Sequence, residues 1–425
     1  MRSQTNTDRL RNATRDIHSR LESTEYAAAV MNGTIGIEPY VGYLRVLAVL
    51  HGTLESALVG VFHPVTKNVW KDELRRSREL AQDLDYFRMR LIPDAPAAIR
   101  TALDTAAELR RLSVDNPVAL VGAIYVLYGS SKGAAVIRSR LNSNCGVNSS
   151  RGASYFTRHG GEGTREWQET SHRIDSSEID ESGIEAAIET AKLVLQCVHD
   201  AFLALHPVDH SALRYTATTL NPDSGDHPVP QDPAVLRVVL HTTDRVLTDF
   251  PYILYRYGDR GRRFTDADGG WLVTLPELGE ASMAGQLNWL RTVLSSRGVP
   301  HILVARHLQL LADELSSTAY DRAYLPLLSG AAERIYRSVD ERVPPELRMQ
   351  QQSVLYRSLG PGSGDPRGDM RCRETAELIA SAVVDRDLGV EDAVDAVVGC
   401  LADRNRSSDT WVDSVLDTVR VFQTS

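Results

Sequence analysis

A stripe of polar side chains near the start of the chain carries residue types from which a metal or cofactor site can be built. The segment LRNATRDIHSRLE has apolar residues at spacings of three and four, which predicts an amphipathic helix. Residues four and seven positions apart share one face of a helix, so Arg11, Thr14, His18 and Glu22 form a single stripe. Glu22 can accept a hydrogen bond from one imidazole nitrogen of His18, which leaves the other nitrogen free to bind a metal. Taken alone, the stripe fits an ordinary surface histidine paired with a glutamate better than it fits a ligand.

A pair of glycines interrupts a strongly apolar helical segment further along the chain, in ALVGAIYVLYGSSKGAAVIRSRL. A glycine inside a helix costs about 0.5–1 kcal/mol relative to alanine, and Gly129 and Gly133, four residues apart, align on one face. Such a pair lets another helix pack very close or lets a flat ligand lie against the backbone, and it favours a kink. Close helix packing explains the pair at least as well as a ligand does.

Together these stretches resemble the heme oxygenase family. LRNATRDIHSRLE is similar to the proximal helix of that family, in which a histidine binds the heme iron and a glutamate follows one turn later. GIEPYVGYLRVLAVLHGTLESAL resembles the next helix, and AIYVLYGSSKGAAVI resembles the distal helix, which bends over the heme. WQET and IEAAIETAKLVLQCVHDAFLAL match the later helices loosely. The resemblance covers about residues 8–206, roughly half of the chain.

The resemblance implies roles for the residues of the first helix. His18 would be the proximal ligand of the heme iron, and Glu22 would orient its imidazole. Arg11 matches a basic position that contacts a heme propionate, and it lies about 10 Å before the histidine along the helix. Thr14 lies on the same stripe and would also face the heme.

The distal stretch matches the family with departures. Gly129 and Gly133 would let oxygen and heme approach the helix, and Ser130 would hold the ordered water that relays protons. Lys132 stands where the family commonly has an apolar residue, and its side chain would reach a propionate. Ala134 stands where a glycine is usual. These departures affect turnover more than they affect heme binding.

The function that the resemblance implies is the oxidative opening of heme, which serves as both substrate and cofactor, to biliverdin, carbon monoxide and ferrous iron. Oxygen would be consumed, and a separate ferredoxin or flavoprotein reductase would supply the electrons, since the chain has no flavin or nicotinamide fingerprint. Two alternatives stay open. One is a heme-binding sensor or adaptor without turnover. The other is a non-heme di-iron oxidase of the same fold built on His51, Glu55 and Glu22, although no ExxH pair occurs on two helices.

The length and the residue pattern predict an all-α chain with more than one domain. A chain of 425 residues exceeds one ordinary core. We expect a heme oxygenase-like helical bundle over residues 1–207, a proline-rich linker over 208–232, and a second helical domain of unknown role over 233–425. Two histidines of that second domain, His301 and His307, fall on different helix faces and are predicted to be structural.

Composition excludes several classes of protein. A formal charge of −9 and a pI near 5.8 argue against nucleic-acid binding. No apolar run approaches the length of a membrane span, and the N-terminus lacks the apolar region of a signal peptide. The four cysteines are widely separated, which fits neither a zinc site nor a disulfide framework and indicates a reducing cytoplasm.

Overall fold

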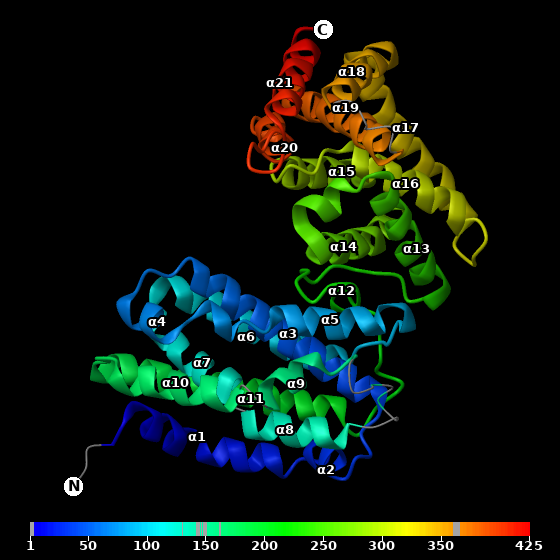
Figure 1. Ribbon diagram of the computed structural model, residues 1–425. Coiled ribbons are helices and arrows are strands. Elements are labelled where there is room, and N and C mark those ends of the chain that lie inside the picture. Colours follow the sequence, from blue (N-terminus) through cyan, green and yellow to red (C-terminus); the bar gives the residue numbers. More distant parts are fainter. Residues whose placement is uncertain are drawn as a thin grey trace. The chain divides into compact units, whose positions relative to one another are not determined.

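The chain folds into helices throughout the part that the structure describes. The computed structural model describes residues 4–129, 131–141, 145, 147, 151–160, 163–359 and 366–425. Within these ranges no strand is formed and β-pairing is limited to isolated bridge residues, such as Asp94 with Arg214, so the all-α prediction is confirmed. The chain divides into two compact units, Met1–Asp226 and His227–Ser425 (Figure 1). The division falls inside the segment that the sequence pattern marks as a linker.

Short polar side chains cap the starts of some helices of the first unit. Thr5 accepts a hydrogen bond from the backbone of Asp8 and caps the first helix, and Asp180 does the same for the longest one through Gly183. The helices are α1 (Asn6–Glu22), α2 (Glu25–Met31), α3 (Ile37–Val59), α4 (Pro64–Val69), η1 (Asp72–Leu74), α5 (Ser77–Phe87), η2 (Arg88–Arg90), α6 (Pro96–Asp115), η3 (Pro117–Ala119), α7 (Leu120–Gly129), α8 (Ser131–Arg140), α9 (Ser154–Gly160), α10 (Gly163–Ser176), α11 (Glu181–Leu205) and α12 (Ala217–Leu220).

The core of the first unit lies around α3, α7 and α11. Helix α3 is buried along most of its length, and α11 contacts α1, α3, α6 and α7. Helices α7 and α11 cross closely because Gly122 has no side chain. A Cβ atom there would lie 2.7 Å from the backbone nitrogen of Ala191 and closer still to the carbonyl oxygen of Ala187. The apolar segment before Gly129 is therefore a buried central helix, as its composition predicts.

Within the first unit, one buried carboxylate holds the segment after α11 against the start of α6. Asp94 is fully buried, pairs with the buried guanidinium of Arg45 and accepts hydrogen bonds from the hydroxyls of Thr216, Thr218 and Thr219. Residues just beyond α11 are thus tied to the start of α6 by polar contacts.

The second unit is also helical. Gly258, with φ of 58°, bends α14. The helices are α13 (Pro233–Asp249), α14 (Tyr252–Leu272), η5 (Leu275–Leu278), α15 (Glu280–Ser295), α16 (Ile302–Leu315), η6 (Arg322–Tyr324), α17 (Leu325–Arg342), α18 (Pro345–Ser358), α19 (Pro366–Asp387), α20 (Ala393–Leu401) and α21 (Asp409–Thr424).

Side chains of α19 fix the starts of two other helices of this unit. Glu374 accepts a hydrogen bond from the backbone nitrogen of Tyr252 at 2.6 Å, where α14 begins. Asp385 accepts one from the backbone nitrogen of His301 at 3.0 Å, and Ser381 accepts one from Ile302 at 3.1 Å, where α16 begins. Each contact satisfies a backbone N–H that has no partner within its own helix.

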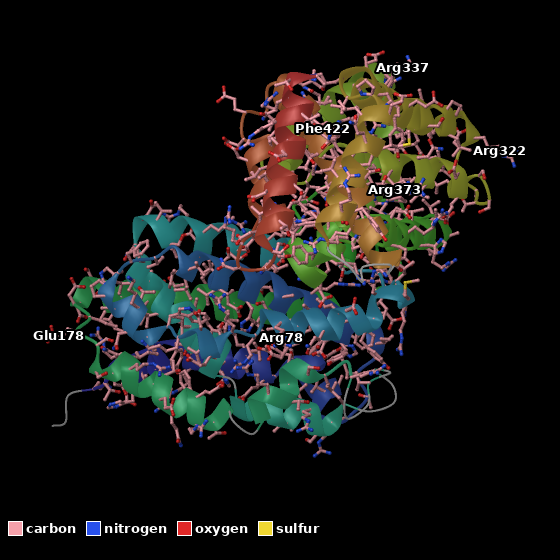
Figure 2. The ribbon with its side chains drawn as sticks, turned by 45° about the horizontal axis from the view of Figure 1, so that its top comes forward. Arg78, Glu178, Arg322, Arg337, Arg373 and Phe422 are labelled. Carbon is pink, nitrogen blue, oxygen red and sulfur yellow. The ribbon has the colours of Figure 1, made fainter. Side chains whose placement is uncertain are left out.

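Side chains of the second unit separate into an apolar interior and a charged exterior. Phe422 of α21 is fully buried, whereas Arg322 and Arg337 are exposed and extend outward (Figure 2). His301 and His307 are buried in different places. His307 lies 3.3 Å from the hydroxyl of Thr242.

Two further features concern the described part as a whole. None of its helices combines the length and apolar composition needed to cross a membrane. The four cysteines are free thiols.

Candidate functional site

The histidine–glutamate pair that the sequence predicts forms on α1. His18 Nδ1 lies 3.5 Å from Glu22 Oε1, and the two side chains are 59% and 67% exposed. The separation is that of an ion pair rather than of a short hydrogen bond. Because Glu22 faces Nδ1, the Nε2 atom of this exposed imidazole is the nitrogen available for a metal.

The other two members of the stripe meet α7. Thr14 is buried and its hydroxyl donates to the carbonyl oxygen of Leu10, while Arg11 is exposed and pairs with Asp8 at 3.1 Å. The side chains of Arg11 and Thr14 both lie next to the hydroxyl of Tyr125 of α7. Burial raises the pKa of the Tyr125 hydroxyl, and the contacts with Arg11 and Thr14 oppose that rise. Tyr125 therefore joins the stripe of α1 to α7.

Helix α1 runs alongside α11 in the same direction. Near its start Arg9 pairs with Glu181 at the beginning of α11. Near its end Arg20 donates to Gln196, 15 residues later in α11, at 3.0 Å. The direction of α1 is thus set by contacts at both ends.

Helix α7 follows α11 in that direction too. Val118 lies next to Gly183 at the start of α11, and Gly122 lies next to Ala187. Helices α1 and α7 are consequently two neighbours of α11 that run the same way.

His18 and Gly129 occupy equivalent places on these two helices. Thr14 lies one turn before His18, and its partner Tyr125 lies one turn before Gly129. Each of the two predicted site residues is therefore one turn beyond the point where α1 and α7 touch. The structure brings the proximal and distal stretches together, although they are more than 100 residues apart in the chain.

The missing side chain at Gly129 makes room for an aromatic ring. A Cβ atom there would lie 3.1 Å from the indole of Trp167, which belongs to α10. The same indole meets the ring of Tyr125 edge-on, with centroids 5.5 Å apart and planes at 64°. The space left by the missing side chain is therefore filled by the indole of Trp167.

The rest of the distal stretch is described only in part. Helix α7 ends at Gly129 and α8 begins at Ser131. Ser130 lies outside the described residues. Lys132 and Gly133 belong to α8, but the side chain of Lys132 also lies outside the described part. Ala134 is buried, with 3% of its surface exposed.

His51, which the di-iron alternative needs as a ligand, is fully buried. Its Nδ1 atom lies 3.2 Å from the hydroxyl of Tyr128, and its Nε2 atom lies 3.1 Å from the hydroxyl of Tyr155. Burial lowers the pKa of His51, so the ring is neutral. Both nitrogens are engaged, and Glu22 lies exposed on α1.

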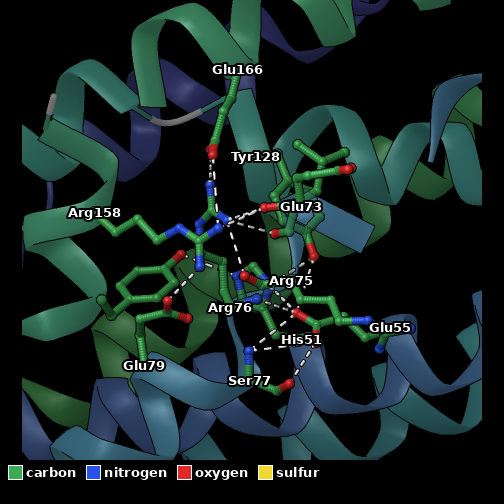
Figure 3. Close-up of polar contacts among 12 residues, drawn as sticks. His51, Glu55, Glu73, Arg75, Arg76, Ser77, Glu79, Tyr128, Arg158 and Glu166 are labelled. Atoms are coloured by element: carbon green, nitrogen blue, oxygen red, sulfur yellow. Dashed lines mark hydrogen bonds and ion pairs between the residues drawn. The ribbon is translucent and has the colours of Figure 1, made fainter. Parts of the chain in front are cut away.

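Glu55 is also engaged by neighbouring groups. It accepts hydrogen bonds from the backbone of Arg76 at 2.7 Å and from the hydroxyl of Ser77 at 2.6 Å (Figure 3). Burial alone would raise the pKa of Glu55, but contacts with His51, Ser77 and Arg76 together lower it. In the described ranges no three or more His, Cys, Asp or Glu side chains are grouped to hold a metal ion. The di-iron alternative has no ligand set there.

The structure places other residues beside the predicted site residues that the sequence pattern did not single out. The rings of Tyr125 and Trp167 pack on each other near Gly129, and Tyr128 ties α7 to α3. A signal for Tyr125 was present, since it lies four residues before Gly129 on the same helix. The role of Trp167 had no local signal, because its partner lies 38 residues earlier in the chain.

Residues 4–204 match the family model described as heme oxygenase. The first unit belongs to the heme oxygenase family. The match ends before the second unit, which lies outside it. No curated protein matches the chain.

Three solved structures are similar to about half of this chain. Heme oxygenase-1 from the cyanobacterium Synechocystis sp. PCC6803, in complex with heme, is 16% identical with a TM-score of 0.43, covering 48% of this chain and 93% of that chain. Heme oxygenase-2 from Synechocystis sp. PCC 6803, in complex with heme and NO, is 21% identical with a TM-score of 0.43, covering 48% and 85%. Heme oxygenase from Leptospira interrogans is 19% identical with a TM-score of 0.42, covering 47% and 98%.

Proposed function

We propose that the first unit binds heme at His18 and opens it oxidatively to biliverdin, carbon monoxide and ferrous iron. Oxygen is the co-substrate, and a separate ferredoxin or flavoprotein reductase supplies the electrons. The observation that carries the proposal is the pairing of two stretches. The exposed His18–Glu22 pair and the glycine end of α7 lie on adjacent helices, each one turn beyond the contact between Thr14 and Tyr125.

The residues present fit a heme group. An exposed imidazole is a suitable axial donor for heme iron. Arg11 is exposed on the same face of α1 as His18 and offers a cation to a carboxylate.

Bound heme would supply both the iron that activates oxygen and the porphyrin carbon that is oxidised. The chain's own residues bind and orient. Glu22 lies 3.5 Å from Nδ1 of His18, and its carboxylate would orient the imidazole so that the Nε2 lone pair points outward. Arg11 and Lys132 are the proposed partners of the propionates, and Thr14 helps to hold α1 against α7 through Tyr125.

On the distal side the proposed contributions are steric and polar. Gly129 and Gly133 let the backbone of α7 and α8 come near the heme. Ser130 is the proposed group that holds water for proton delivery. Trp167 and Tyr125 exclude water from one wall of the site, because their rings pack on each other.

A hemin titration with a matched histidine pair tests the proposal. His241 of α13 is 64% exposed and pairs with Glu314, as His18 pairs with Glu22, but it lies in the second unit. His18→Ala should abolish or strongly shift the Soret band and weaken hemin binding, whereas His241→Ala should leave both unchanged. An unchanged spectrum and affinity in His18→Ala would show that His18 is not the ligand.

Turnover is tested separately. Hemin-loaded protein, a ferredoxin or flavoprotein reductase and NADPH should produce a bile pigment that absorbs in the red. If heme binds at His18 but no pigment forms, the protein is a heme-binding sensor or adaptor. The second unit lies outside the family match, and this additional unit favours the sensor or adaptor as a second candidate function. We also propose a reducing, cytoplasmic location, which the four free thiols support.

A further inference from the structure

A buried polar cluster contacts the last turn of α7, next to Gly129. It consists of His51 and Glu55 of α3, Arg76 just before α5, Tyr128 of α7 and Tyr155 of α9, and we call it the His51 cluster. All five residues are at most 3% exposed. Tyr128 directly precedes Gly129, so the cluster holds the last side chain of α7 before the predicted distal glycine.

Tyr128 is held at both its hydroxyl and its ring. The hydroxyl donates to Glu55 at 3.2 Å and lies 3.2 Å from His51 Nδ1. The ring meets that of His51 edge-on, with centroids 5.1 Å apart, and it packs against Trp70 at 5.7 Å. The guanidinium of Arg76 lies 5.8 Å from its centroid. These contacts fix both the depth and the rotation of the end of α7.

The proton count defines the state of His51. The Tyr128 hydroxyl has one proton, and Glu55 accepts it, so the tyrosine oxygen accepts a proton from Nδ1 of His51. Nε2 then accepts from the hydroxyl of Tyr155. A neutral imidazole donates one hydrogen bond and accepts one. Burial lowers the pKa of His51, which favours this neutral form. Every polar atom of the ring is satisfied.

The same cluster also holds the other neighbour of Gly129. Arg76 pairs with Glu166 of α10, and Figure 3 shows the two side chains pointing toward each other. Glu166 directly precedes Trp167, whose indole touches the face of Gly129. The residue before Gly129 in the chain and the ring against it in space are thus both held by the His51 cluster.

We propose that His51, acting through Tyr128, is a positioning residue that sets how closely the Gly129 end of α7 approaches heme bound at His18. This inference rests on the proposed function. His51 does not touch the heme in this proposal. It holds the hydroxyl of Tyr128, and Tyr128 holds the backbone that follows.

Two tyrosines on opposite sides of the same imidazole provide a matched test. Tyr128→Phe and Tyr155→Phe each remove one hydroxyl and keep the ring, and the two rings are 3% and 2% exposed. Only Tyr128 belongs to α7. The readouts are the hemin dissociation constant and the C–O stretching band of the carbon monoxide complex, because that band responds to dipoles near the bound gas. Circular dichroism and thermal unfolding confirm that each variant is folded at the assay temperature.

The expected result separates positioning from stability. Both variants should unfold at lower temperature than the unaltered protein, since each loses a buried hydrogen bond. Tyr128→Phe should also shift or broaden the C–O band and weaken hemin binding by up to about tenfold, the equivalent of one hydrogen bond. Tyr155→Phe should change neither.

If folded Tyr128→Phe has the band and affinity of the unaltered protein, or if both variants move them equally, the positioning role is overturned while the proposed function stands. If the unaltered protein binds no hemin, the proposed function fails and the inference fails with it. Variants of His51 give a second measurement in case Tyr128→Phe does not fold. His51→Asn keeps an N–H donor toward Tyr128 and should retain the C–O band, whereas His51→Leu should shift it, and equal bands in the two would again overturn the role.

Discussion

Replacing Gly122 by alanine should separate α7 from α11 and destabilise the first unit. The added Cβ would lie 2.7 Å from the backbone nitrogen of Ala191 and 2.8 Å from the carbonyl carbon of Ala187. Ordinary van der Waals contact begins near 3.4 Å, so α7 has to retreat by more than about 0.6 Å. The obstacle is helix backbone, which cannot rotate aside as a side chain does.

The magnitude follows from two opposing effects. Overpacking a core commonly costs about 1–3 kcal/mol, and a clash with backbone belongs at the upper end or beyond it. Alanine regains about 1 kcal/mol of helix propensity relative to glycine. We therefore expect a net loss of about 2–4 kcal/mol. For a domain of this size the loss corresponds to a fall in Tm of roughly 5–15 °C.

Differential scanning calorimetry of the full chain, with two glycine controls, measures this effect. Gly52 lies inside α3, and its added Cβ would meet only a side-chain oxygen of Asp223, at 2.9 Å. Gly285 lies inside α15, and nothing lies within 4 Å of its added Cβ. Both controls should be neutral or stabilising by up to about 1 kcal/mol. If Gly122→Ala unfolds within about 0.5 kcal/mol of the unaltered protein, the close crossing of α7 and α11 is wrong.

Three further predictions concern buried charge, pH and backbone conformation. Asp94→Ala leaves the guanidinium of Arg45 buried without its counter-charge and should lower the free energy of unfolding by about 3–5 kcal/mol in a urea titration. The double variant Arg45→Met, Asp94→Leu removes both charges and should lower it much less. Burial lowers the pKa of His301 to about 3, so the unfolded chain binds more protons below about pH 6.5. His301 therefore contributes a loss of about 1.4 kcal/mol of stability for each pH unit as the pH falls from 6.5 toward 3, and unfolding titrations between pH 7 and 4.5 should show a shallower dependence in His301→Phe. An unaltered slope would contradict the burial of a neutral His301. Gly298 has φ of +80°, and a Cβ atom there would lie 2.8 Å from a backbone oxygen. Gly298→Ala should therefore cost about 1–3 kcal/mol and lower the Tm of the second unit. An unchanged Tm would contradict that backbone conformation.

Much of the fold could be predicted because the sequence signals of a helix lie in residues that are close together in the chain. Apolar spacing of three and four marks α1, and near-continuous apolarity marks α7 as buried. The contact between His18 and Glu22 needs only a helix, since residues four apart always face each other. The glycine pair is a local signal as well, since Gly129 and Gly133 lie four residues apart in the chain.

The partners of these residues could not be predicted in the same way. The contact of Thr14 with Tyr125 joins positions 111 residues apart, and that of His51 with Tyr155 joins positions 104 apart. No periodic pattern states which face of one helix meets which face of another. His51 and Glu55 show the consequence, because their spacing is equally suitable for a metal site and for the buried hydrogen bonds that they make.

Gly129 shows what the sequence determined and what only the tertiary structure determined. From the sequence alone, a glycine four residues before another in an apolar helix means that something approaches the backbone closely, and a helix or a flat ligand would serve equally well. Only the packing of α10 against α7 brings the indole of Trp167 to that face, and only the shared neighbour α11 brings His18 of α1 alongside. Helix periodicity is a property of neighbouring residues, whereas the choice of which surfaces meet depends on how all the helices bury their apolar faces at once.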